Sequence, residues 1–219
     1  MPTILSIRRI GLEFSDLAIR RPIELPDHPL SRAPGLHQSV VLRNIAVKTG
    51  KLAAGERLEE DYPWRMAMGN MWEEFYFSLK PDYVWQPGEL TVESSGGLVS
   101  MNADGLGAPH VPGYEAGLAL IETKCTECKI VESADALLEK FGKNWWIYHH
   151  QARAYCHGYG PRVVVWPMLH YRGDWQGSGP VCMEYVVRFT DLEVEQTWDM
   201  IGRYVTELLK AVVDDDVPF

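Results

Sequence analysis

The sequence contains few basic residues for its length and no long apolar run. Its 21 Lys and Arg residues against 30 Asp and Glu give a net charge of −9, whereas a generic nucleic-acid-binding domain is usually basic. No stretch approaches the roughly 20 apolar residues that cross a bilayer. The first ten residues lack the basic, apolar and small-residue regions of a secretory signal. A cytoplasmic protein with no membrane partner is therefore expected.

Cysteine is also scarce, with four residues in 219. Cys125 and Cys128 have the spacing of a zinc or redox site, but a structural zinc site uses four ligands, usually two such pairs. Cys156 and Cys182 stand alone. We expect all four to be reduced, buried or half-buried thiols, because disulfides are rare in the cytoplasm. A zinc protein built around Cys125 and Cys128 is the alternative.

No internal repeat or low-complexity linker divides the 219 residues, so one domain is expected. Residues 1–64 form its N-terminal strand and helix extension, 65–190 its core, and 191–219 a helix with an acidic tail. The order of elements predicts a mixed α/β domain with a central sheet flanked by helices. A short strand and irregular chain are expected up to Pro34. Helices are expected at Leu36–Lys48, about Arg65–Leu79, Ser133–Phe141, about Asn144–Tyr159 and about Asp191–Val213, with Asp191 as the N-cap of the last. Strands are expected at Leu90–Val92, Leu98–Met101, Leu118–Cys125, Arg162–Tyr171 and Val181–Phe189.

Two opposite charges end the apolar strand Leu118–Cys125. Side chains alternate along a strand, so Glu122 and Lys124 are expected on one face and Thr123 on the other. Such charges are costly to bury unless they are paired or bound, and a surface ion pair on an edge strand is the simplest alternative. Asp104, at a predicted hairpin corner nearby, is expected to reach the same face. Two carboxylates, an ammonium and an exposed backbone carbonyl form a site suited to Mg²⁺.

Asp104 followed by Glu122-Thr123-Lys124 resembles the bipartite signature of the PD-(D/E)XK nucleases, the restriction-endonuclease-like superfamily. Ala103 stands where the signature has its proline, a relaxed position in the branch described next.

Two further motifs resemble those of the RecB, phage λ-exonuclease and YqaJ-like branch, in the same order along the chain. Glu73 follows Gly69 on the preceding helix, where the family places an acid, and Gln151 precedes Tyr155 on the following helix. Glu74 competes with Glu73 for the helix acid, and the spacing from Gly69 favours Glu73.

The resemblance implies a restriction-endonuclease-like fold and a metal-dependent deoxyribonuclease that hydrolyses phosphodiester bonds with a metal-activated water. Lys124 is implied to orient or deprotonate this water, and Gln151 and Tyr155 to position the substrate or the lysine. The implied ligands of Mg²⁺ or Mn²⁺ are Asp104, Glu122 and the Thr123 carbonyl, with Glu73 supporting this metal or a second one.

The same branch implies an exonuclease or DNA-end-processing enzyme of phage or mobile-element type, with DNA as its partner in recombination, in the host cytoplasm if the source is viral. A homo-oligomer and a phage recombination or host protein partner stay open, as does exonuclease against endonuclease. The alternative is a catalytically idle nuclease fold that binds DNA or a host protein. The charge of −9 motivates this alternative, and the intact set of Asp104, Glu122 and Lys124 speaks against it.

Aromatic residues flank the Gln151 motif. His149 and His150 are expected to divide between solvent and core, with contact to phosphate as the alternative. Trp145 and Trp146 fit either core packing or stacking on a base.

Overall fold

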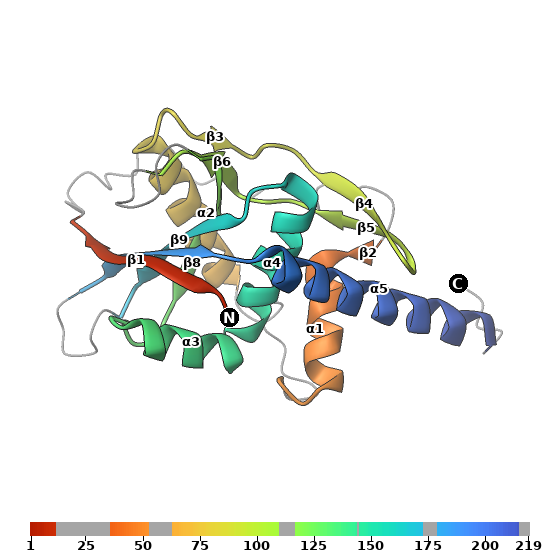
Figure 1. Cartoon of the computed structure of the whole chain (residues 1–219). Helices are drawn as coiled ribbons and strands as arrows, with labels where there is room; N and C mark the ends of the chain where they lie inside the picture. The colour runs from red at the N-terminus through yellow and green to blue at the C-terminus, as the bar shows by residue number, and fades with distance from the viewer. Residues whose placement is uncertain (12–35, 53–62, 110–116, 144, 173–178, 215–219) are drawn as a thin grey trace.

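A mixed sheet of seven strands forms the centre of the described part of the molecule (Figure 1). The structure is a computed structural model, and it describes residues 1–11, 36–52, 63–109, 117–143, 145–172 and 179–214. The strand order is β1-β10-β9-β7-β6-β3, and β8 also pairs with β9. The strands are β1 (Thr3–Ile10), β3 (Val84–Trp85), β6 (Gly105–Gly107), β7 (Ala119–Ile121), β8 (Lys124–Thr126), β9 (Val163–His170) and β10 (Val181–Arg188).

Both β7 and β8 run parallel to β9, while the other pairings in this sheet are antiparallel. The mixed α/β class expected from the sequence is confirmed. The segment expected as an N-terminal extension supplies β1, which pairs with β10 along the edge of the sheet. The irregular chain before Pro34 and the end of the acidic tail lie outside the described residues.

A second, three-stranded sheet contains β2 (Leu36–His37), β4 (Leu90–Ser94) and β5 (Gly97–Met101). The helix expected from Leu36 begins at Gln38 instead, because Leu36 and His37 pair in parallel with β5. The His37 side chain then caps this helix by accepting the Ser39 N–H.

Helices cover both faces of the large sheet: α1 (Gln38–Lys48), α2 (Pro63–Ser78), α3 (Ala134–Gly142), α4 (Trp146–Tyr159) and α5 (Asp191–Asp214). Trp72 and Tyr76 of α2 pack with Ile121 on one side. On the other side, Leu120 packs in a cluster that includes residues of α1, α3, α4 and α5. Successive residues of β7 therefore face α2 and α4 in turn. Within the described residues, no helix is both long and apolar enough to cross a membrane.

The start of α5 differs by one residue from the prediction. Asp191 is its first helical residue, and Thr190 is the cap. Glu193 Oε2 accepts hydrogen bonds from the N–H and the hydroxyl of Thr190, each at 3.0 Å, and the Thr190 hydroxyl accepts the Glu193 N–H at 3.3 Å. This reciprocal arrangement is a capping box.

An ion pair between a half-exposed arginine and a buried glutamate joins β1 to the sheet. Arg8 Nε donates to Glu184 Oε1 at 2.6 Å, and the Tyr76 hydroxyl donates to Glu184 Oε2 at 3.1 Å. Glu184 is only 1% exposed. A buried carboxylate is tolerated there because both of its oxygens have partners.

Candidate active site

The strand expected at Leu118–Cys125 is interrupted at Glu122 and Thr123, between β7 and β8. The Glu122 N–H donates to the Val165 carbonyl of β9 at 2.9 Å. In a parallel ladder the next bond to Glu122 comes from the N–H two residues further along the partner, and that residue is Pro167, which has none. The Glu122 carbonyl therefore loses its ladder donor, and the regular strand breaks beside the candidate site.

Glu122 and Lys124 lie on one side of the sheet, as their alternation predicted. Lys124 Nζ donates to Glu122 Oε1 at 2.5 Å. Glu122 is 1% exposed, and its other oxygen, Oε2, is buried without a hydrogen-bond partner among the residues that the structure describes. The alternative of a surface ion pair is wrong, because the side chains of Lys124 and Glu122 are only 17% and 2% exposed.

Asp104 lies in the connection between β5 and β6 and contacts the same segment. It does not lie at a hairpin corner, because β5 belongs to the small sheet and β6 to the large one, so the chain crosses between sheets here. Asp104 Oδ2 accepts the N–H and the hydroxyl of Thr123, each at 2.7 Å. These bonds hold the Asp104 carboxylate next to Glu122.

Glu73 approaches from α2. Burial raises its pKa, and the Asp104 carboxylate raises it further, against the opposing effects of Trp85 and Lys124. The Trp85 indole N–H donates to Glu73 Oε1 at 2.7 Å. Glu74 is exposed instead. The structure therefore brings Glu73, the acid favoured by its spacing from Gly69, into the electrostatic field of the site.

The charged groups of Glu122, Asp104 and Lys124 shift one another's pKa values. Burial raises the pKa of Glu122 to about 8, with a further contribution from the Asp104 carboxylate, while Lys124 acts in the lowering direction. Burial alone would lower the pKa of Lys124, but the Glu122 and Asp104 carboxylates raise it above its ordinary value. Lys124 is thus held as an ammonium, and the buried carboxylates carry an electrostatic cost.

Helix α4 lines the other side. Gln151 Nε2 donates to the Tyr155 hydroxyl at 2.9 Å, as expected for residues one turn apart. Tyr155 is 2% exposed, and burial, Glu122 and Asp104 raise its pKa well above the ordinary value. The predicted Gln151 and Tyr155 pair therefore faces the carboxylates.

Two neighbours were missed by sequence reasoning. Lys124 Nζ lies 5.4 Å from the ring centre of Tyr148, which precedes Gln151 by three positions and so shares its helix face. That spacing was a usable signal. Gln38, fully buried, donates to the Gln151 carbonyl at 2.8 Å from α1. Contact between residues 113 positions apart leaves no local signal in the sequence.

The donor set suits a hard divalent cation. Within the described ranges, no three His, Cys, Asp or Glu side chains are grouped to hold a metal by themselves. Magnesium usually keeps several waters and takes one or two carboxylates plus substrate phosphate, so it does not need such a cage. Asp104, Glu122 with its unpartnered buried oxygen, and the Thr123 carbonyl are compatible with that mode.

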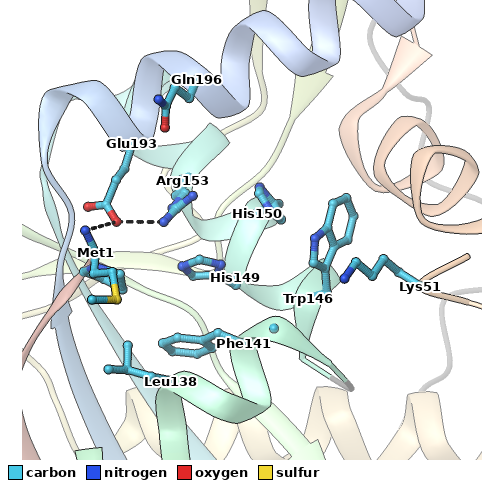
Figure 2. Close-up of a pocket in the computed structure, with 12 residues that line it drawn as sticks. Met1, Lys51, Leu138, Phe141, Trp146, His149, His150, Arg153, Glu193 and Gln196 are labelled. Atoms are coloured by element: carbon cyan, nitrogen blue, oxygen red, sulfur yellow. Dashed lines mark hydrogen bonds and ion pairs between the residues drawn. The ribbon is translucent and has the colours of Figure 1, made fainter. Parts of the chain in front are cut away.

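A separate pocket of about 430 Å³ lies on the opposite face of α4 (Figure 2). His149 and His150 both line it, and neither is on the Gln151 face. His149 is buried, whereas His150 is half-buried. Burial, followed by Arg153, lowers the pKa of His149 to about 2 and that of His150 to about 3. Trp146 also lines this pocket.

Figure 2 shows His149 between Arg153 and Phe141 in this pocket. Its ring stacks on Phe141 with centroids 4.6 Å apart. Trp145, the other flanking tryptophan, is 2% exposed in the core, so packing accounts for it. These aromatic residues are therefore separated from the carboxylate cluster.

The four cysteines are free thiols, as expected. Cys156 and Cys182 are buried, whereas Cys125 and Cys128 are half-buried. Burial raises the pKa of Cys125 to about 11, which makes its thiolate scarce at neutral pH.

No protein-family model matches the sequence, and no curated protein matches it. Among solved structures, one titled "Crystal structure of SSO0001" is similar with a TM-score of 0.49 and 11% sequence identity, over 82% of this chain and 80% of that chain. Similarity of this extent establishes neither a family nor an activity for this chain.

Proposed function

We propose that the chain is a divalent-metal-dependent DNA nuclease of the PD-(D/E)XK type that hydrolyses phosphodiester bonds. The observation that carries this proposal is the buried Glu122–Lys124 pair, with Asp104 fastened beside it by Thr123. A structural ion pair has no use for a second acid, since each added carboxylate in a buried place is costly.

The electrostatic cost points to a cation. Burial, and then the Asp104 carboxylate, raise the pKa values of both Glu73 and Glu122, so these carboxylates repel one another even though Lys124 acts in the lowering direction. A divalent cation would relieve this repulsion and give Glu122 Oε2 the partner it lacks. Its ligands would be Asp104, Glu122 and the Thr123 carbonyl, with Glu73 in support, and Mg²⁺ or Mn²⁺ fits this oxygen set.

The bound cation would supply Lewis-acid polarisation of the phosphate and a water of lowered pKa. The oxygen of water would bond to phosphorus as the water gives up a proton to solvent, the P–O bond to the leaving oxygen would break, and that oxygen would take up a proton. Lys124, protonated in the chain as described, would donate to the attacking water or to a phosphate oxygen and offset the charge that develops there.

Helix α4 would orient these groups. The Gln151–Tyr155 pair presents an amide and a hydroxyl on the face that meets the carboxylates. Tyr148, over which Lys124 Nζ lies at 5.4 Å, would limit the positions open to the lysine. The pair would position substrate or lysine without exchanging protons, because the Tyr155 hydroxyl is strongly held in its neutral form.

The test uses purified protein with end-labelled linear DNA and with circular DNA, each in Mg²⁺, Mn²⁺ and EDTA. Metal-dependent loss of linear DNA alone is expected for an exonuclease or end-processing enzyme, and cutting of circles for an endonuclease. Binding of DNA without cleavage under either metal would contradict the proposal and favour the idle nuclease fold. Stoichiometric zinc in the purified protein would instead support a site at Cys125 and Cys128.

A further inference from the structure

An exposed tryptophan stands beside the carboxylates at the edge of the large sheet. Trp85 ends the two-residue strand β3, and 44% of its surface remains exposed. β3 pairs with β6, so that Trp85 lies opposite Gly105, the residue directly after Asp104. A large aromatic surface is thus kept in contact with solvent one position from a proposed metal ligand.

Two contacts fix the orientation of this ring. Its indole N–H donates to Glu73 Oε1 at 2.7 Å. The ring also stacks on Phe77 of α2, with centroids 6.3 Å apart and planes 22° from parallel. Because the N–H is already used, the exposed ring is available for stacking but not for reading the edge of a base by hydrogen bonds.

The backbone around Trp85 helps to fix the position of its ring beside the carboxylates. A Cβ added at Gly105 would lie 2.3 Å from Phe77, so glycine is needed for Phe77 to lie against β6 and support the ring. The next residue, Gln86, has φ of 48°, a conformation that costs a non-glycine residue energy, and its N–H donates to the Asp104 carbonyl at 2.9 Å. The same turn therefore ties Trp85 to the Asp104 backbone.

We propose that Trp85 is a stacking platform for an unpaired nucleobase next to the scissile phosphate, so that single-stranded DNA or a frayed end is the preferred substrate. This inference rests on the proposed nuclease function. Stacking of a base on an aromatic side chain tolerates any sequence and contributes about 1–3 kcal/mol. A base paired inside a duplex has no free face to offer, so the platform would distinguish unpaired from paired DNA.

Binding in Ca²⁺, which permits no turnover in many Mg²⁺ nucleases, isolates this step from catalysis. The probes are a fluorescein-labelled single strand, the same strand with an abasic terminal nucleotide, and a blunt duplex, followed by fluorescence anisotropy. Trp85→Ala should weaken single-strand binding by roughly 5- to 150-fold, the equivalent of 1–3 kcal/mol, and change duplex binding by less than about twofold. The abasic strand should bind both proteins with similar, weak affinity.

Two variants separate stacking from other roles of the residue. Trp85→Phe removes the hydrogen bond to Glu73 but keeps a ring, so it should retain most of the single-strand affinity. Val84→Ala changes the neighbouring residue of β3, 55% exposed, and should bind like the wild type. Equal losses of single-strand affinity in Trp85→Phe and Trp85→Ala would assign the effect to the hydrogen bond with Glu73. An equal loss of affinity in Val84→Ala would indicate a general apolar surface. Either result overturns the inference.

The failure of this inference is distinguishable from failure of the proposed function. If the wild type cuts DNA in a Lys124-dependent manner while Trp85→Ala binds single strands normally, the stacking platform is wrong and the nuclease stands. If the wild type neither binds nor cuts any of these DNAs, both are wrong.

Discussion

Thr123 donates both its N–H and its hydroxyl to one oxygen of Asp104, at 2.7 Å each. Thr123, which lies between Glu122 and Lys124 in the sequence, therefore fixes the position of Asp104, the third charged group of the site. Thr123 lies in the break between β7 and β8, where both its backbone and its side chain reach Asp104. The short Glu-Thr-Lys segment thus organises all three groups through local geometry.

We expect Asp104→Asn to raise the Mn²⁺ concentration for half-maximal cleavage by more than tenfold, because it removes a ligand charge. Thr123→Val removes one hydrogen-bond donor to Asp104 and keeps the backbone N–H. Its Mn²⁺ concentration for half-maximal cleavage should therefore rise less, on the order of tenfold. Metal titrations of the cleavage rate measure both values. A half-saturating concentration in Asp104→Asn equal to that of the wild type would exclude Asp104 as a ligand.

Lys124→Ala is expected to lower kcat by about two orders of magnitude or more, the usual contribution of a positioned proton donor or acceptor. The variant should stay folded, because Glu122 can take up a proton once the ammonium is gone. Lys143→Ala is the matched control, since Lys143 is an exposed lysine paired with Glu139. Single-turnover rates and circular dichroism test this, and equal rates in the two variants would remove Lys124 from the mechanism.

The raised pKa of Glu122 predicts a pH-dependent loss of stability in EDTA. Its pKa is about 8 in the folded chain and near 4.5 in its ordinary state, so between these values the folded state binds the proton more tightly. This contribution is complete below about pH 4.5 and is lost as the pH rises toward 8. Glu122→Gln cannot ionise, so its urea midpoint should rise relative to the wild type from pH 5 to 9. A constant difference across this range would contradict the burial of an ionisable Glu122.

Arg8→Ala should destabilise the fold by on the order of 3 kcal/mol, because it leaves the buried Glu184 carboxylate without its cation. Tyr76→Phe should cost about 1 kcal/mol, the scale of one hydrogen bond. Arg9→Ala changes the exposed neighbour and should stay within about 0.5 kcal/mol of the wild type. Urea unfolding measures all three, and equal values for the two arginines would show that the pair contributes nothing.

Local periodicity predicted much of this fold. The long elements β9, β10 and α5 have strong apolar patterns, and their predicted bounds differ from the structure by at most one residue at either end. Alternation placed Glu122 with Lys124, and helical spacing placed Gln151 with Tyr155. These relationships depend on neighbours in sequence, which is why the chain reveals them.

Long-range pairing accounts for the rest. β3 has two residues and β6 has three, too few to show a period, so neither was predicted and Trp85 went unnoticed. The break after β7 depends on Pro167, a residue of another strand. Asp104 was expected at a hairpin, but the sequence does not state which sheet each strand joins.

The role of Glu122 in catalysis is tested most directly by comparing Mn²⁺-dependent cleavage of end-labelled DNA by Glu122→Gln and Glu74→Gln, both made in the full chain. Glu122 is buried beside Lys124, whereas Glu74 is exposed on α2. We expect the wild type and Glu74→Gln to cut at equal rates and Glu122→Gln to be at least about 100-fold slower. Equal rates in both variants, or no cleavage by the wild type, would contradict this role.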